Sequence, residues 1–78
     1  MSWMPALREL LDRLVGMMVD TGIRYEDAQR EFDKRFISRV VQASDGNVGK
    51  AAERLGVHRN TLARKIKELK IRTRPPAS

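Results

Sequence analysis

The fold is decided by one stretch of this 78-residue chain, Asn47-Val-Gly-Lys-Ala-Ala-Glu-Arg-Leu-Gly-Val-His-Arg-Asn-Thr-Leu-Ala-Arg-Lys-Ile-Lys-Glu-Leu69. It contains two short helical patterns joined by Gly56-Val57. The first pattern places three apolar residues on one face: Ala51, Ala52 and Leu55. The second repeats Leu62, Ile66 and Leu69 at helical spacing and carries basic residues elsewhere: Arg59, Arg64, Lys65 and Lys67. A short helix pair with a glycine near the turn and a basic second helix is typical of a helix-turn-helix that binds DNA.

Two longer helices are predicted before this motif. Over residues 5–20 an apolar stripe is formed by Leu7, Leu10, Leu11, Leu14, Val15 and Met18. Gly22 then ends the first helix, as glycine commonly does just past a helix end. Over residues 25–43 a second stripe is formed by Tyr25, Ala28, Phe32, Phe36, Val40 and Ala43, with Ile37 and Val41 widening it. Ser44-Asp45-Gly46 ends this helix, because Gly46 and the local side-chain hydrogen bonds favour a turn.

The motif itself is expected to contain a helix over residues 48–55 and another over residues 59–69. Asn47 is placed as the N-cap of the first of these helices, and His58 lies near the start of the second. Ile71 is expected to fold back as a hydrophobic contact after the last helix. Since no strand pattern is present, the predicted fold class is all-α with four helices.

Length and cysteine content limit how such a chain is stabilised. A 78-residue chain forms one domain at most, and a domain of this size buries only about 60% of its unfolded surface. The chain has no cysteine, so neither disulfides nor thiolate-bound metals can stabilise it. Oligomerisation is the remaining common way in which so small a domain gains stability. The absence of cysteine also fits a reducing cytoplasm.

The positive charge is concentrated near the C-terminus. Residues 47–78 hold nine Lys/Arg and two Glu, a net charge of +7, whereas residues 1–46 hold seven Lys/Arg and eight Asp/Glu, a net charge of −1. A basic segment of this kind indicates a polyanionic partner for that part of the chain, or a solvated basic surface with no partner. No apolar run approaches 18 residues and the N-terminus lacks the pattern of a signal peptide, so we expect a soluble cytoplasmic protein without membrane contact.

The apolar stripes of the first two helices are wider than one small domain can easily hide. We expect them to form the core of a homodimer, with these interface residues: Leu7, Leu10, Leu14, Met18, Phe32 and Phe36. The alternatives are an intramolecular core, or docking of the first helix on another protein or a membrane. The mixed charges Arg8, Glu9 and Asp12 on its polar side disfavour a membrane. The expected organisation is a dimerisation region over residues 1–46, a helix-turn-helix over residues 47–71 and a disordered basic tail over residues 72–78.

The polar and basic residues in and around the second motif helix fall into two predicted groups, one that contacts base edges and one that contacts phosphates. Arg59 lies at the N-terminal end of the second motif helix, where a bidentate contact with guanine is the commonest specific contact, and His58 and Asn60 are short polar groups suited to base edges. The remaining basic side chains are predicted to bind phosphates, which fixes register without reading sequence: Lys50, Arg64, Lys65, Lys67, Lys70, Arg72 and Arg74. With a single histidine and no cysteine, we predict neither a metal site nor a cofactor. No nucleophile lies in a catalytic pattern with a base, so the chain is not expected to be an enzyme.

From Phe32 to Ile71 the chain resembles the Fis-type helix-turn-helix family, which includes the C-terminal DNA-binding domains of sigma-54-dependent activators. The resemblance is carried by Gly46-Asn47, Ala51-Ala52, Leu55-Gly56, Arg59-Asn60-Thr61-Leu62, Lys65 and Leu69. It implies that Arg59 contacts a guanine edge, that Thr61 contacts phosphate, that Arg64 lies close to the groove wall, and that Asn47 caps its helix and reaches phosphate. Ala63 and His58 depart from the family's small nucleoid protein, which has a basic residue and an asparagine there.

These observations together predict a dimeric bacterial DNA-binding protein that acts as a transcriptional regulator or as a nucleoid-associated DNA bender. One alternative is a protein-interaction adaptor in which the helix-turn-helix contacts an acidic protein. The other is the C-terminal DNA-binding domain of a larger activator, against which the initiating Met1 and the lack of a linker-like N-terminus weigh mildly.

Overall fold

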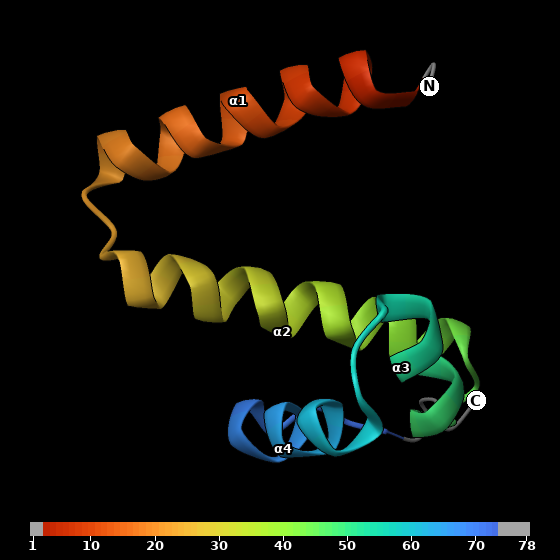
Figure 1. Cartoon of the computed structure of the whole chain (residues 1–78). Helices are drawn as coiled ribbons and strands as arrows, with labels where there is room; N and C mark the ends of the chain where they lie inside the picture. Colours follow the sequence, from red (N-terminus) through yellow and green to blue (C-terminus); the bar gives the residue numbers. More distant parts are fainter. Residues whose placement is uncertain (1–2, 74–78) are drawn as a thin grey trace, which may run out of the picture.

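The protein consists of four helices in a computed structural model that describes residues 3–73 (Figure 1). These are α1 (Trp3–Thr21), α2 (Tyr25–Ala43), α3 (Val48–Leu55) and α4 (Arg59–Leu69). The all-α prediction is confirmed, and the predicted bounds of α2, α3 and α4 agree with the structure. The first helix is longer than the predicted residues 5–20 at both ends. The predicted basic tail begins at Arg72, and its residues 74–78, Arg74 among them, lie outside the described part.

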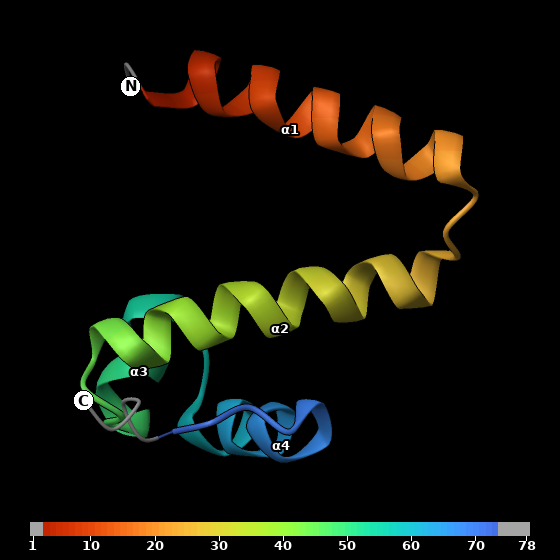
Figure 2. The ribbon, with the colours of Figure 1, turned by 180° about the vertical axis from the view of Figure 1, so that it is seen from behind.

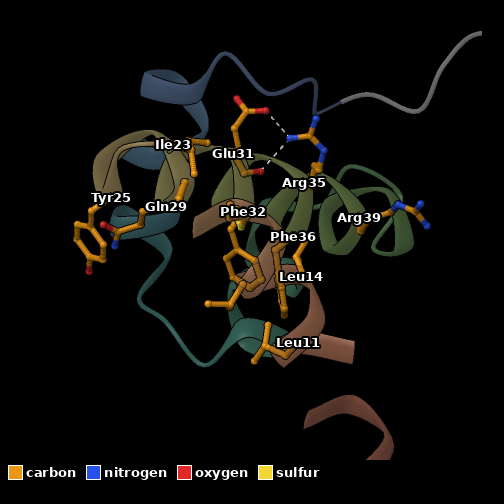
Figure 3. Close-up of a pocket in the computed structure, with 13 residues that line it drawn as sticks. Leu11, Leu14, Ile23, Tyr25, Gln29, Glu31, Phe32, Arg35, Phe36 and Arg39 are labelled. Atoms are coloured by element: carbon orange, nitrogen blue, oxygen red, sulfur yellow. Dashed lines mark hydrogen bonds and ion pairs between the residues drawn. The ribbon is translucent and has the colours of Figure 1, made fainter. Parts of the chain in front are cut away.

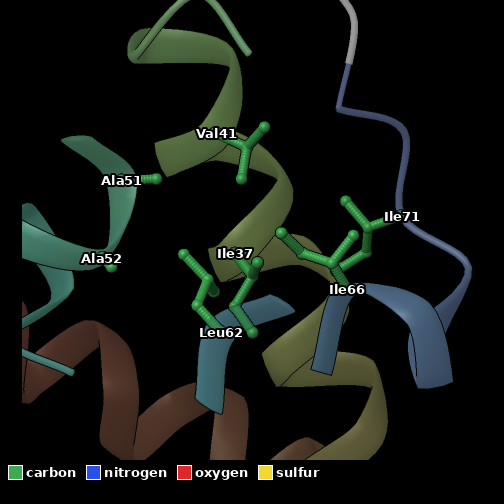
Figure 4. Close-up of a cluster of buried hydrophobic side chains, with 7 residues drawn as sticks. All are labelled: Ile37, Val41, Ala51, Ala52, Leu62, Ile66 and Ile71. Carbon is green, nitrogen blue, oxygen red and sulfur yellow. The ribbon is translucent and has the colours of Figure 1, made fainter. Parts of the chain in front are cut away.

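The buried core lies where α2, α3 and α4 meet (Figure 4). Its side chains come from all three helices and from the segment after α4: Ile37, Val41, Ala51, Ala52, Leu62, Ile66 and Ile71. Leu62 and Val41 are the largest fully buried side chains, and the small Ala51 and Ala52 let α3 approach them closely. Because Ile37 and Val41 belong to α2, the core extends across the boundary that the sequence suggested between residues 46 and 47.

Ile71 completes this core, as the sequence predicted. Lys70 adopts a left-handed conformation with φ of 55° and turns the chain back at the end of α4. The Ile71 N–H then donates to the Ile66 carbonyl at 3.0 Å, and the Ile71 side chain is buried with Ile66 in the core. This is the hydrophobic contact that commonly accompanies such a helix end.

The helix α1 diverges from α2 and makes almost no contact with the rest of the chain (Figures 1 and 2). Its apolar side chains are therefore uncovered, with Leu10 63% and Met17 67% exposed. An amphipathic helix of this kind usually buries its apolar face, but no other helix within residues 3–73 covers that of α1.

A large apolar groove of about 700 Å³ lies between α1 and α2 (Figure 3). From α1 it is lined by Leu11, Leu14, Val15 and Met18, and from α2 chiefly by Phe32 and Phe36. The centroids of the two phenylalanine rings are 5.3 Å apart, and both residues are about half exposed. Four of the six predicted dimer-interface residues thus line this groove, while Leu7 and Leu10 lie on α1 outside its lining.

Candidate nucleic-acid interface

The orientation of α3 is fixed at both ends by local hydrogen bonds. Asn47 caps its start, as predicted, because the Asn47 Oδ1 atom accepts a hydrogen bond from the Lys50 N–H at 3.1 Å. At its end, Gly56 takes a φ of 70°, which a residue with a Cβ adopts only with strain. The Val57 N–H then donates to the Ala52 carbonyl at 3.1 Å. The cap at Asn47 fixes the start of α3, and the turn at Gly56 separates α3 from α4.

The start of α4 is capped by His58. The His58 Nδ1 atom accepts a hydrogen bond from the Asn60 N–H at 3.1 Å, and the His58 carbonyl accepts from the Leu62 N–H at 3.0 Å. The sequence-based prediction places His58 near the start of this helix and assigns it to base edges, without a cap. The preference of N-caps for side chains that accept a hydrogen bond was the signal that would have revealed the cap.

The burial of Leu62 and Ile66 determines which side of α4 faces outward. By helical spacing, Asn60, Arg64 and Lys67 lie on the side opposite these two core residues, and all three are exposed. Arg59, at the first position of α4, is exposed as well. None of these three basic side chains forms an ion pair with another residue in the described range 3–73. Two cations on the outward side of α4, Arg64 and Lys67, and a third at its N-terminal end, Arg59, thus have no ion-pair partner within that range.

Lys65 differs from the other predicted phosphate ligands. It lies on the flank of α4 that faces α2, and its Nζ atom is 3.5 Å from the Asp33 Oδ2 atom. Thr61 lies on the same flank, is half-buried and lines a small groove with Phe36 and Leu62. A phosphate group would have to compete with Asp33 for Lys65, so this lysine is less available than Arg64.

The helix α3 contributes Lys50 and Arg54. Lys50, predicted to bind phosphate, is exposed in the first turn of α3. Arg54 was not considered as a functional residue, and the structure gives it a structural contact, because its Nη1 atom donates to the Ala43 carbonyl at 3.4 Å. This contact satisfies one of the free carbonyl groups at the end of α2. Lys70 and Arg72 follow α4 and are exposed.

The acidic side chains do not all lie away from this surface, because Glu68 is exposed on α4 one turn after Arg64. Glu31 and Arg35 form an ion pair on α2 with 2.6 Å between Oε1 and Nη1. The hydrogen bond and the charge of Arg35 lower the pKa of the Glu31 carboxyl below its usual range. Within residues 3–73, no group of three or more His, Cys, Asp or Glu side chains is arranged to hold a metal ion. No helix in that part of the chain is both long enough and apolar enough to cross a bilayer.

Part of the chain is similar in sequence to a known transcriptional regulator. The chain is 45% identical over 47 residues to the DNA-binding transcriptional regulator NtrC of Azospirillum brasilense. The match covers 60% of this chain and 10% of that protein, so the chain corresponds to a small part of the longer regulator. No solved structure matches significantly.

The model of a bacterial regulatory protein family matches residues 28–69, which include most of α2 and all of α3 and α4. This range is more than half of the chain and contains six of the seven core residues, with Ile71 just beyond its end. The resemblance recognised in the sequence is thereby confirmed, and the chain belongs to the Fis family of bacterial regulatory proteins.

Proposed function

We propose that the protein is a homodimeric regulator that binds double-stranded DNA and inserts α4 into the major groove. The observation that carries this proposal is the set of exposed cations on α4, with Arg59 at its N-terminal end and Arg64 and Lys67 on its outward side, none of which forms an ion pair within residues 3–73. Cations on the outer side of the second helix of a helix-turn-helix are placed to meet phosphates and base edges. Membership of a family of regulatory proteins supports the same assignment.

The proposed contacts follow the position of each side chain. Arg59, His58 and Asn60, at the N-terminal end of α4, are assigned to base edges, because this end enters the groove in helix-turn-helix proteins. A larger group is assigned to phosphates on either side of the groove: Asn47, Lys50, Thr61, Arg64 and Lys67. Lys65 contributes less than these residues, since it is paired with Asp33.

The groove between α1 and α2 supports the dimer. A helix from a second copy would cover the exposed apolar residues of α1 and the half-exposed Phe32 and Phe36 together. We infer that α1 of the partner inserts between α1 and α2, and that the second copy receives α1 of the first in the same way. Such a two-fold arrangement would bury both sides of the wide apolar stripe of α1. One side would contact the partner's α1 and the other side the partner's α2.

A dimer of this kind presents two copies of α4 to one face of the duplex. If their separation is shorter than a helical turn of DNA, binding bends the duplex and favours flexible steps at bases that the protein does not touch. The proposed role is therefore transcriptional regulation or DNA bending in the nucleoid of the bacterial cytoplasm. The similarity to a small part of NtrC favours one second candidate, in which the chain is the DNA-binding part of a longer activator.

A fluorescence-anisotropy titration at two salt concentrations tests the proposal. A labelled duplex of about 30 base pairs is titrated at roughly 50 and 200 mM salt, where a protein with several phosphate contacts loses on the order of a thousandfold in affinity. Unlabelled mixed-sequence competitor then separates specific from general binding. No binding at the lower salt concentration contradicts the DNA-binding function and favours a protein-interaction adaptor.

The Arg59→Ala variant tests the assignment of base contacts. It is expected to lose about 1–3 kcal/mol of binding free energy and to relax specificity at one base pair per half-site. Lys67→Ala is the matched control, since it removes one exposed cation from the same helix and should weaken binding to all sequences alike. Equal losses on every sequence for both variants would contradict the division of roles.

A further inference from the structure

Of the two ring nitrogens of His58, one accepts a hydrogen bond from the protein and the other forms none within residues 3–73. The Nδ1 atom lies 3.1 Å from the Asn60 backbone nitrogen and accepts its hydrogen. A backbone N–H can only donate, so Nδ1 in this contact carries no hydrogen. The contact therefore assigns the ring to the neutral tautomer with its hydrogen on Nε2.

The Nε2–H group is directed away from the first turn of α4. The two nitrogens of an imidazole ring are directed in nearly opposite directions, so an Nδ1 atom directed into the first turn of α4 leaves Nε2 directed away from that turn. The His58 side chain is exposed, and no hydrogen bond to Nε2 is formed within residues 3–73. His58 immediately precedes Arg59, at the end of α4 that carries the proposed base contacts.

We propose that His58 contacts DNA only as a hydrogen-bond donor, through Nε2–H, because its cap on α4 fixes the tautomer. This inference rests on the proposed DNA-binding function and adds a chemical restriction to it. Among groups in the major groove, Nε2–H can be accepted by guanine O6 or N7, by adenine N7 and by thymine O4, whereas the amino groups of cytosine and adenine are excluded. A phosphate oxygen offers the same acceptor chemistry, and the experiment below distinguishes the two sources.

The restriction has a consequence for specificity. An asparagine at this position, capping through its Oδ1 atom, would also present only donors, but at the end of a shorter side chain. The rigid ring of His58 carries its donor further from the backbone than an asparagine amide does. The structure thus assigns His58 a longer reach toward an acceptor ahead of α4.

The tautomer is tested first, in the free protein. A long-range ¹H–¹⁵N correlation spectrum of the imidazole distinguishes the two neutral tautomers and the cation, and the assignment is unambiguous because the chain has a single histidine. The expected result is the Nε2–H tautomer, both in the free protein and in the complex. A ring with its hydrogen on Nδ1 overturns the proposal, whatever the affinity for DNA.

The contact is tested with variants that keep the cap. His58→Ser retains an acceptor for the Asn60 N–H but lacks a donor of similar reach, and it should bind DNA roughly two- to tenfold more weakly with an unchanged melting temperature. His58→Asn, which keeps a donor, should lose less. Equal binding by the wild type and His58→Ser overturns the contact alone, whereas a wild-type protein that does not bind DNA overturns the proposed function as well.

Modified DNA then identifies the acceptor. Single 7-deazapurine or 4-thiothymine substitutions remove or weaken base acceptors, and single methylphosphonates neutralise phosphates. At the position that His58 contacts, the modification should reduce wild-type affinity to the level of His58→Ser and leave that variant unaffected. A base analogue with this effect identifies a specificity contact, and a methylphosphonate with this effect identifies a phosphate contact. If every modification affects both proteins equally, the contact does not exist.

Discussion

At the residue scale, two helix caps lie on the side of the protein that is proposed to face DNA. Asn47 accepts from the Lys50 N–H, and His58 accepts from the Asn60 N–H. In each case one polar atom of the side chain accepts this hydrogen bond, and the other forms no hydrogen bond within residues 3–73. Substituting these residues is therefore expected to change both the stability of the fold and the proposed contacts with DNA, and the two effects need separate controls.

The variant Asn47→Ala is expected to lower the free energy of unfolding by about 0.5–2 kcal/mol, because the first turn of α3 loses its cap. Urea denaturation followed by circular dichroism measures this loss. Asn47→Asp is the matched control, since a carboxylate still accepts from the Lys50 N–H but repels phosphate. It should retain stability and lose DNA affinity. Full DNA affinity in Asn47→Asp would show that Asn47 serves only the fold.

Arg64 and Lys65 are adjacent cations that differ in their surroundings. Arg64 is exposed and unpaired within residues 3–73, whereas Lys65 is paired with Asp33. We expect Arg64→Ala to reduce the salt dependence of DNA binding by about one unit of slope per subunit. Lys65→Ala should have a smaller effect, because Asp33 already offsets part of its charge. Titrations at several salt concentrations compare the two, and equal effects would show that the Asp33 pair does not withhold Lys65 from DNA.

At the element scale, α2 contributes to two different packing surfaces. Ile37 and Val41 are buried against α3 and α4, whereas Phe32 and Phe36 lie about half exposed beside the groove under α1. The sequence presents these residues as one wide stripe, and the structure divides them between an intramolecular core and an open surface. This division allows α2 to connect the proposed dimer contact rigidly to the helix-turn-helix.

The helix α1 contains Gly16, which has a low helix propensity. Substituting it tests whether α1 makes a close contact at this position. A Cβ added at Gly16 meets no atom within 4 Å in the single chain. Gly16→Ala should therefore stabilise the protein by up to about 1 kcal/mol, since alanine is the better helix former. Thermal denaturation measures the change. A lower melting temperature would instead place Gly16 at a close helix–helix contact in the dimer.

At the scale of the whole molecule, the described residues 3–73 combine a packed unit of α2, α3 and α4 with a helix, α1, that no other helix in this range covers. The seven core residues all belong to the packed unit, and α1 contributes none of them. We propose that a second copy of the chain covers α1. In a symmetric dimer, α1 of each copy would then occupy the groove of the other. The proposed dimer would therefore link assembly to DNA affinity.

Leu14, which lines the groove from α1, tests that link. Leu14→Asp should convert the dimer to a monomer in sedimentation equilibrium, because a carboxylate in an apolar interface carries a large desolvation cost. DNA affinity should fall by about a hundredfold or more, since the two copies of α4 no longer act together. Arg13→Asp places the same carboxylate on the polar side of α1 and should remain dimeric. A wild-type protein that sediments as a monomer would contradict the dimer.

The sequence by itself determined the helices α2, α3 and α4, the cap at Asn47, the return of Ile71 to the core and the family. These features depend on interactions between residues close together in the chain, such as capping hydrogen bonds and helical periodicity, so a local pattern contains the information. The outward position of Arg64 follows in the same way, since it lies opposite Leu62 and Ile66 on one helix.

Only the tertiary structure decided which side chains meet across helices. The Lys65–Asp33 pair, the bond from Arg54 to the Ala43 carbonyl and the division of the α2 stripe all join residues that are distant in sequence. Periodicity identifies which residues of a helix share a side, but the angles between helices determine what that side contacts. Those angles arise from packing around Ala51, Ala52 and Leu62, where the exact volumes of several side chains act together.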